Sequence, residues 1–549
     1  MKELSCDVLV IGAGETGIRA AVEAKRCGAE KVILANKGAL GTTGVMFSEL
    51  TYGWDMQAAT GENDPTDSKD IHLSDILNAA QGTASAELAS IVVNESSDRL
   101  ADLQDLFGLE LATWEGSSKP RQVYGCFSTK NRAYQFVDPR RIKASMADSV
   151  KRYGITLLEN TLIASLVVHE GRCIGAVGVD RGNELYLISA GATVLSAGGA
   201  TGIFKHSFAS PGMYGDGYAL GLRAGCRLAN MEFMQFGLGV LEPRYRALFL
   251  DRLMYLEPRI GFTMDHAFPR PLKELLAEHS KHFPFSCIDD SFNVDVAIFK
   301  ETLANGGEGV PVDISHIPTE ELEKIPVYRL WRGWFGPDLD PHENTLRVTT
   351  FAHACNGGIM INADAATDVP GLYAAGEMAS GPHGANRLGG NMHAVCQVFG
   401  ARAGRKAGSY AAAAGSRTDI KPFCTLPSGK SRGHEFYAGI KQELGDLLWE
   451  NVNVLRNEVC LTKTLSRAKE LCVRLSEIDP SPEEYWDHSE ASSAALTAWA
   501  IAGAALSRTE SRGSHYREDH PATDPKPYVV KIKLNGKELD FVNTERYDD

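Results

Sequence analysis

The sequence has no hydrophobic run that could span a bilayer. Its longest apolar stretch, Ala494 to Leu506, is rich in alanine and shorter than the roughly 18 residues that a spanning helix needs. The first residues, Met1 to Asp7, lack the apolar core of a signal peptide. We therefore expect a cytoplasmic protein with no direct membrane insertion.

The eleven cysteines contain no Cys-x-x-Cys pair and do not cluster along the chain. An odd, scattered set argues against a disulfide framework and is typical of reduced thiols in the cytosol. Zinc and iron–sulfur sites need closely spaced ligands. We therefore predict no metal site in this chain.

Basic residues are fewer than acidic ones, with 56 Lys and Arg against 70 Asp and Glu and a net charge of −14. An acidic chain of this kind has no general attraction for nucleic acid, so no nucleic-acid partner is expected. The length of 549 residues is enough for several domains, and a hydrophobic share of 44% is that of a globular protein.

The pattern of residues 6–35 predicts a βαβ unit. A buried strand at 6–11 is followed by a glycine-rich turn, a helix at 16–26 and a second strand at 31–35. The turn has the spacing G-x-G-x-x-G, made by Gly12, Gly14 and Gly17. In this motif the glycines allow a tight turn, a close approach of the backbone to a pyrophosphate, and close packing of helix on strand. The helix N-terminus adds free N–H groups for the phosphates, so we predict a dinucleotide site.

The second strand ends in Asn36-Lys37, where dinucleotide-binding domains usually carry an acid that bonds a ribose hydroxyl. An amide can also form a hydrogen bond with a ribose. The prediction of dinucleotide binding therefore stands, while the simplest NAD signature is missing.

Composition changes along the rest of the chain. Residues 164–195 alternate with period two and predict an antiparallel meander, which ends in a second glycine turn at Gly198-Gly199. Residues 240–350 are rich in proline and aromatics and indicate an inserted domain. The other predicted elements are a helix at 392–406, helices within 431–475 and 484–508, and a hairpin at 528–542 with Asn535-Gly536 as its turn.

Aromatic and basic residues alternate near the end of the inserted segment. They are Tyr328, Arg329, Trp331, Arg332, Trp334 and Phe335. Two interpretations stay open at this stage: aromatic packing between domains, or a lid wall over a substrate.

Four groups of motifs give the chain a resemblance to a known family. They lie at 10–21; at 195–202, 215–217, 224–225 and 231–236; at 353, 357–358, 369–377 and 383–391; and at 510–519. In these motifs the chain resembles the flavoproteins of the fumarate reductase and succinate dehydrogenase group, which includes L-aspartate oxidase and the adenylylsulfate reductase flavoprotein. The resemblance covers nearly the whole chain.

The resemblance implies an α/β fold: a Rossmann-like FAD-binding domain, an inserted α+β capping domain, and a C-terminal helical domain with a terminal hairpin. The expected boundaries are 1–239 and 351–425 for the two parts of the FAD-binding domain, 240–350 for the capping domain, and 426–549 for the C-terminal domain.

The resemblance also implies FAD as cofactor. By position, Gly12, Gly14 and Gly17 would lie at its pyrophosphate, and Asn36 and Lys37 near the adenosine ribose. Gly44, Gly198, Gly199, Asp216 and Gly376 would make further contacts, Glu377 would bond the ribitol, and Asn391 would face the isoalloxazine. Some relatives attach FAD through a histidine after the second strand. The matching stretch, 38–44, ends at Gly44 and has no histidine, so we predict noncovalent FAD.

His353 and Arg387 match two substrate-binding residues of fumarate reductases and are the candidate catalytic pair. Three departures speak against fumarate itself. Residues 235–239 read QFGLG where relatives usually have Gln-Phe-His-Pro-Thr, residues 289–293 read DDSFN where a proton-donating arginine is usual, and residues 354–356 read ACN where Tyr-Thr-Met or similar is usual. Acidic Asp289 and Asp290 would repel a dianion if they faced it.

We therefore expect hydride transfer between flavin and an organic acid other than a symmetric C4 dicarboxylate. Two alternatives remain: an enzyme like the adenylylsulfate reductase flavoprotein, acting on a sulfur oxyanion, or an electron-relay subunit of a larger redox complex. A separate iron–sulfur subunit is a possible partner. Replacement donors for the missing substrate residues could come from Tyr328, Arg329, Arg332 or His266.

Overall fold

The computed structural model describes residues 1–45, 55–137, 139–249, 251–335, 340–413 and 418–548. Its central sheet has the strand order β6-β2-β1-β9-β8-β7, and β17 also pairs with β9. The strands are β1 (Lys2–Ile11), β2 (Val32–Ala35), β6 (Thr156–Leu158), β7 (Thr161–His169), β8 (Arg172–Asp180), β9 (Leu185–Leu195) and β17 (Leu372–Ala374). The predicted βαβ unit and the antiparallel meander are both present.

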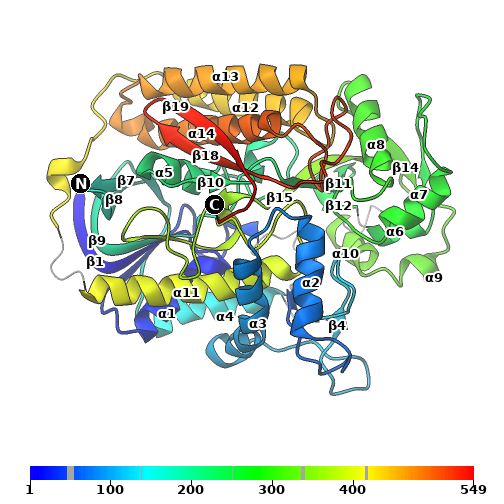
Figure 1. The fold of residues 1–549 in the computed structure, drawn as a ribbon, viewed down its shortest axis with the longest axis horizontal. Coiled ribbons are helices and arrows are strands. Elements are labelled where there is room, and N and C mark those ends of the chain that lie inside the picture. The colour runs from blue at the N-terminus through cyan, green and yellow to red at the C-terminus, as the bar shows by residue number, and fades with distance from the viewer. Residues whose placement is uncertain (46–54, 138, 250, 336–339, 414–417, 549) are drawn as a thin grey trace.

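The parallel strands of this sheet end together. Ile11 of β1 pairs with Ala35 of β2 and with Leu195 of β9, and Leu195 pairs with Ala374 of β17. Ligands of open α/β sheets bind at such a carboxyl edge. The helices α1 (Glu15–Arg26) and α11 (Asn391–Ala413) lie along one face of the sheet (Figure 1).

Residues 55–152 add helices and a small sheet beside this first layer. The helices are α2 (Lys69–Ala80), α3 (Ala86–Phe107) and α4 (Pro139–Arg152), and the sheet consists of β3 (Asp55–Gln57), β5 (Ala133–Gln135) and β4 (Gln122–Val123). Side-chain caps start α2 and α3, because Ser68 and Ser85 accept hydrogen bonds from the backbone N–H groups of Ile71 and Leu88.

The segment between β10 (Leu228–Ala229) and β16 (Gly358–Ile359) forms a second body with its own sheet, in the order β12-β11-β15-β14-β13. Its strands are β11 (Met234–Glu242), β12 (Ala247–Leu248), β13 (Arg259–Ile260), β14 (Val310–Asp313) and β15 (Leu346–Cys355). Its helices are α6 (Asp251–Tyr255), α7 (Leu272–His279), α8 (Phe292–Ala304), α9 (Thr319–Leu322) and α10 (Pro326–Phe335). Leu238, Val312 and Trp331 belong to its separate hydrophobic core.

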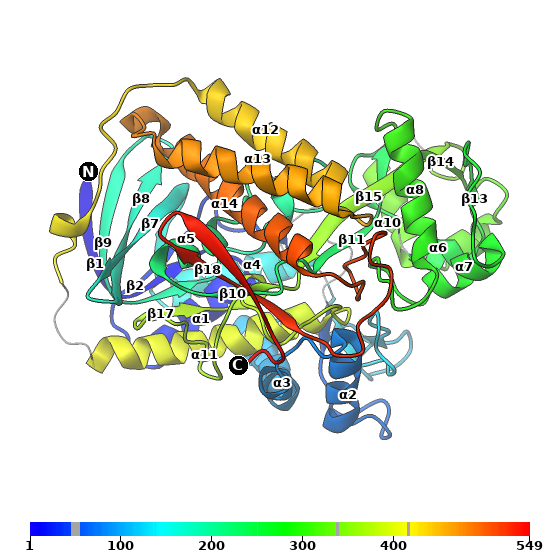
Figure 2. The same cartoon turned by 45° about the horizontal axis from the view of Figure 1, so that its top comes forward.

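The C-terminal part covers the opposite face of the central sheet with α12 (His434–Asn451), α13 (Glu458–Ser476) and α14 (Tyr485–Ser507) (Figures 1 and 2). Helix α14 packs on α5 (Asp216–Ala224). The hairpin of β18 (Val529–Asn535) and β19 (Glu538–Thr544) joins β10 through β18. These elements confirm the predicted fold class, while the numerical domain boundaries stay predictions. In the described part of the chain, no helix is long and apolar enough to cross a membrane.

Candidate functional site

A cavity of about 1200 Å³ opens at the carboxyl edge of the central sheet. Its lining runs from the turn after β1, past the ends of β2 and β9, to His353 on β15 and Arg387 before α11. Of the predicted cofactor residues, Gly12, Gly14, Asn36, Lys37, Gly44, Gly198, Asp216 and Glu377 line it, whereas Gly17, Gly199, Gly376 and Asn391 stand behind it.

The first glycine turn has the shape that a pyrophosphate needs. Gly12 has a φ of +101°, and a Cβ there would lie 2.4 Å from the carbonyl oxygen of Ser196. Gly14 faces open space, because a Cβ there would meet no atom within 4 Å. Gly14 also begins α1 without a side-chain cap, which leaves the first N–H groups of that helix available to an anion. The turn therefore fits a dinucleotide phosphate.

Lys37 links two carboxylates at the end of β2. Its ammonium nitrogen lies 2.8 Å from Asp216 and 2.9 Å from Glu490 of α14. Asp216 keeps one buried oxygen, Oδ1, without a hydrogen-bond partner among the described residues. A sugar hydroxyl would satisfy this acceptor, so the group fits the ribose end of a dinucleotide.

Asn36 lines the same end of the cavity, but its amide is already engaged. Its Oδ1 accepts from the N–H of Ala13 at 3.3 Å, and its Nδ2 donates to the carbonyl oxygen of Gly38 at 2.8 Å and to the hydroxyl of Thr43 at 3.1 Å. Asn36 therefore shapes the loop after β2. The ribose role predicted for it stays a prediction.

The backbone at Cys355 and Gly199 holds the carboxylate of Glu377 in place. Its Oε1 accepts from the N–H of Cys355 at 2.9 Å, and a Cβ on Gly199 would lie 2.4 Å from the same oxygen. Burial raises the pKa of Glu377. At the start of α11, Asn391 does not reach the cavity, because its Oδ1 lies 3.2 Å from Nε2 of His72. Its neighbours Met392 and His393 line the cavity instead.

Arg387 is a buried cation with neutral partners. Its Nε donates to Oε1 of Gln235 at 3.1 Å and its Nη1 to the carbonyl oxygen of Leu388 at 3.0 Å. Among the described residues, no carboxylate lies within ion-pair distance of it, and burial lowers its pKa. The carboxylates of Glu377 and Asp55 act on its charge only from beyond that distance, so an anionic ligand in the cavity would compensate the buried charge further.

His353 lies beside Arg387, with 3.4 Å between its Nε2 and Nη2 of the arginine. Since arginine can only donate, Nε2 is the acceptor and the proton of the neutral ring is on Nδ1. Burial and the nearby guanidinium lower the pKa of His353 to about 3. His353 is therefore a neutral hydrogen-bond donor at pH 7.

Phenylalanines occupy the place of the missing polar residues. The rings of Phe208 and Phe283 stand edge-on to His353, with centroid distances of 6.0 and 5.4 Å. A Cβ on Gly237 would lie 2.2 Å from Cζ of Phe283, so no larger side chain fits at the position where relatives usually have histidine. One end of the acid site is thus apolar.

Most of the suggested replacement donors point elsewhere. Arg329 lines the cavity, but Arg332 pairs with Glu323 and His266 with Glu301. Tyr328 and Trp331 are buried in the core of the inserted body, so they pack within this body and not between domains. The side chains of Trp334 and Phe335 lie outside the described residues.

The two aspartates that replace the usual arginine do not face the cavity. Asp289 pairs with His282 and Asp290 with Arg270. They would therefore not repel a substrate anion.

One basic residue of the cavity was missed by the sequence analysis. Arg246, in the turn between β11 and β12, lines the cavity and donates to the carbonyl oxygen of Ala209 at 2.7 Å. It makes no ion pair with a described carboxylate. Nothing in its local sequence marks it, because only the pairing of β11 with β15 brings this turn to the site.

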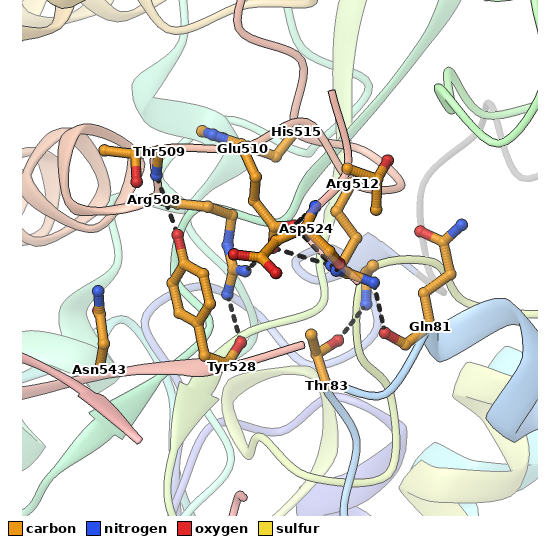
Figure 3. Close-up of polar contacts among 12 residues, drawn as sticks. Gln81, Thr83, Arg508, Thr509, Glu510, Arg512, His515, Asp524, Tyr528 and Asn543 are labelled. Carbon is orange, nitrogen blue, oxygen red and sulfur yellow. Dashed lines mark hydrogen bonds and ion pairs between the residues drawn. The ribbon is translucent and has the colours of Figure 1, made fainter. Parts of the chain in front are cut away.

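The motif near the C-terminus supports the loop that carries Arg387. The carboxylate of Glu510 lies between Arg508 and Arg512, at 2.6 and 2.8 Å, and Arg512 also donates to the carbonyl oxygen of Gln81 (Figure 3). The N–H of Ser514 donates to the carbonyl oxygen of Ala385 at 3.0 Å. A buried ion network thus fixes the backbone two residues before Arg387.

Comparisons with known proteins agree with this geometry. The family model of the FAD binding domain matches residues 7–392, and that of the fumarate reductase flavoprotein C-term matches residues 441–538. One of the subunits of the fumarate reductase (CoM/CoB) of Methanothermobacter marburgensis is 30% identical, with 97% of each chain covered.

Two solved structures share the fold. Mycobacterium smegmatis Sdh1, in complex with UQ1, has a TM-score of 0.83 at 25% identity and covers 100% of this chain and 95% of its own. Adenylylsulfate reductase from Archaeoglobus fulgidus has a TM-score of 0.71 at 16% identity, with 99% and 96% covered, a likeness of fold alone.

Proposed function

Because the chain belongs to the FAD-dependent oxidoreductases of the fumarate reductase and succinate dehydrogenase flavoprotein family, we propose that it transfers hydride between FAD and an organic acid with one carboxylate and an apolar body. FAD, when bound, supplies the two-electron chemistry. The observation that carries the proposal is Arg387, a buried guanidinium with neutral partners beside a wall of phenylalanine.

Arg387 would bind the carboxylate of the substrate. A guanidinium offers two parallel N–H donors to a carboxylate, which fixes the orientation of the acid as well as its position. The aromatic rings of Phe208 and Phe283 would then contact the part of the substrate that follows, and would exclude water from it. At this wall the chain has Gly237 and Gly239 where relatives usually have the histidine and threonine for a second carboxylate, which disfavours fumarate.

His353 would hold the acid from the other side. Its Nδ1–H is the available donor, because Nε2 accepts from Arg387. A substrate carboxylate on Arg387 would offset the charge that lowers the pKa of His353, so the ring would gain basicity only when the site is filled. Arg246 and Arg329, both on the cavity lining, are the remaining cationic candidates for proton delivery.

The experiment is anaerobic reoxidation of the chemically reduced protein, followed by flavin absorbance. The panel contains fumarate, crotonate and cinnamate, with cinnamamide as a neutral control for the carboxylate. We expect cinnamate or crotonate to reoxidise the protein faster than fumarate, and cinnamamide to be inert. Fumarate as the fastest oxidant would contradict the proposal. Adenylylsulfate belongs in the same panel, because rapid reoxidation by it would establish the sulfur alternative instead.

We also propose that electrons come from a separate protein partner in the cytoplasm. The described residues contain no group of His, Cys, Asp and Glu able to hold a metal. The relative from Methanothermobacter marburgensis is named as one subunit of its enzyme. Copurification with an iron–sulfur protein that reduces the flavin would support this; an FAD-loaded chain that turns over with NADH alone would contradict it.

A further inference from the structure

A second cavity, of about 350 Å³, lies at the end of α5 that is remote from the FAD site. Five parts of the chain enclose it: Ala164 of β7, the end of α5, the helices α13 and α14, and the β18–β19 hairpin near its turn. These elements contact one another across the C-terminal layer (Figure 2). Its volume falls within the range of about 300–1,000 Å³ that is typical of small-molecule sites.

The charge of this cavity is of one sign. Its lining contains Arg223 and Lys537 and, among the described residues, no Asp or Glu. Neither cation makes an ion pair or a hydrogen bond with another described residue. In a chain with a net charge of −14, a cavity with two such cations and no described acid marks a place for an anion.

Arg223 has the position of a ligand-binding group. Protein surrounds it closely enough that burial lowers its pKa, and yet its side chain keeps solvent-exposed surface. Both hold when an exposed side chain lines an open cavity. The groups that act on its charge are Cys472 and Tyr485, whose pKa values burial raises, and the carboxylate of Asp216 at the other end of α5. Because Asp216 is outside ion-pair distance, the guanidinium has room for a bidentate acceptor.

The other wall of the cavity is apolar. Leu496 and Trp499 of α14 and Leu534 of β18 contribute to it, and Trp499 is almost fully buried. Ser489 and Ser492 of α14 also line the cavity. A ligand that satisfies both sides has an anionic head and a compact apolar or aromatic body.

Two helices join this cavity to the FAD site. Helix α5 begins at Asp216, which lines the FAD cavity, and carries Arg223 at its other end. In α14, Glu490 lines the FAD cavity while its neighbour Ser489 lines the second one. Lys37 ties Asp216 to Glu490, so a shift of either helix would reach the ribose end of the dinucleotide site.

We propose that this second cavity is an effector site, which binds a small aromatic or branched carboxylate through Arg223 and acts on the FAD site through α5 and α14. The proposal is independent of the identity of the substrate. Linkage makes the effect reciprocal: a carboxylate that changes FAD affinity is itself bound more or less tightly when FAD is present.

The test uses 4-fluorobenzoate with the FAD-loaded full chain and fluorine NMR. Arg387 can also bind a carboxylate, so the Arg387→Met variant isolates the second cavity. In that variant we expect one bound signal, which Arg223→Met removes with at least a tenfold rise in Kd, or about 1.4 kcal/mol. 4-Fluorobenzamide should bind neither site, and 4-fluorophenyl phosphate separates a preference for phosphate from one for carboxylate.

A second pair of variants guards against misfolding of the Arg223 variant. Lys537→Glu adds a carboxylate in an exposed turn at the mouth of the cavity and should weaken the same signal severalfold, whereas Lys533→Glu, exposed on β18 outside the cavity, should not. A signal that survives both Arg223→Met and Lys537→Glu overturns the site. A signal that depends on Arg223 but leaves the flavin absorbance and the FAD affinity unchanged overturns the coupling.

Discussion

Arg508 and Arg387 are both buried, but they differ in what surrounds them. Arg508 is fully buried between two carboxylates, with 2.8 Å to Glu232 and 2.6 Å to Glu510. Arg387 contacts an amide oxygen, a carbonyl oxygen and a neutral imidazole. Burial alone therefore does not decide the role of an arginine. A paired guanidinium holds the fold together, while one left with neutral partners is available for a ligand.

The largest effect should follow the loss of Arg508. Arg508→Met leaves the fully buried Glu232 without its hydrogen-bonded cation, and we expect a loss of about 3–5 kcal/mol in the free energy of unfolding. Urea denaturation of the FAD-loaded protein measures it. Arg467→Met, which breaks a surface pair with Glu443, is the control and should cost about 0–1 kcal/mol. Equal losses in the two variants would remove the contrast.

Arg387→Met should behave in the opposite way. It removes a buried cation that has no described carboxylate within ion-pair distance, so the free energy of unfolding should change far less than in Arg508→Met. Binding of the organic acid, followed by the flavin spectrum, should weaken by about 2–5 kcal/mol, because a buried charge pair with the substrate is lost. Arg387→Lys keeps the charge but not the two parallel N–H donors of the guanidinium, so it should recover only part of the binding. Unchanged acid binding in Arg387→Met would refute the substrate role.

The phenylalanine wall can be tested at Gly237. Gly237→His forces a side chain against Phe283 and should destabilise the protein by about 1–3 kcal/mol. In the double variant with Phe283→Ala, space is restored, so the two changes should be non-additive in thermal unfolding. Gly439→Ala in α12, where a Cβ meets nothing within 4 Å, is the matched control and should not destabilise. Additive losses would show that the wall does not exclude the histidine.

The smallest effect is a pH dependence at His353. Burial and Arg387 lower its pKa to about 3, below the value of about 6.5 in an unfolded chain, so the unfolded state binds more protons between these values. Stability therefore falls as the pH drops from 6.5 towards 3. This acid-induced loss of stability should be absent from His353→Asn. It amounts to about 1 kcal/mol at pH 5.5 and to nothing at pH 7.5, and denaturation at both pH values measures it.

His383 provides the control for that prediction. The same two causes lower its pKa to about 3, but it does not line the cavity. His383→Asn should therefore reduce the acid sensitivity of folding in the same way and leave acid binding intact. If both variants lost acid binding equally, His353 would have no separate role at the site.

The parts of the fold that follow local rules were predictable from the sequence. The strand and helix of the βαβ unit agree within a few residues, because a buried strand, a glycine turn and an amphipathic helix are each encoded in neighbouring residues. The hairpin turn at Asn535-Gly536 is confirmed for the same reason, with Gly536 at a φ of +62°. Resemblance of motifs added the family and FAD.

The chemistry of the acid site was less predictable, because it depends on contacts between distant segments. Gly237 showed that a histidine was missing, but only the structure places Phe283 in that space. Arg246 lies at the cavity because β11 pairs with β15, and no local sequence pattern indicates that pairing. The second cavity likewise joins residues 164 to 537, and no single stretch of sequence contains its charge pattern.

The ion pair between Lys37 and Glu490 has a consequence for the synthesis and folding of the protein. The nucleotide pocket begins near the start of the chain, at Ile11 and Gly12, and takes one of its walls from a helix close to the other end. The ribosome synthesises the glycine turn long before α14, and N-terminal regions fold first during synthesis. FAD therefore meets a complete pocket only after α14 has been synthesised and has packed on α5, so loading of FAD is a late step in the folding of this chain.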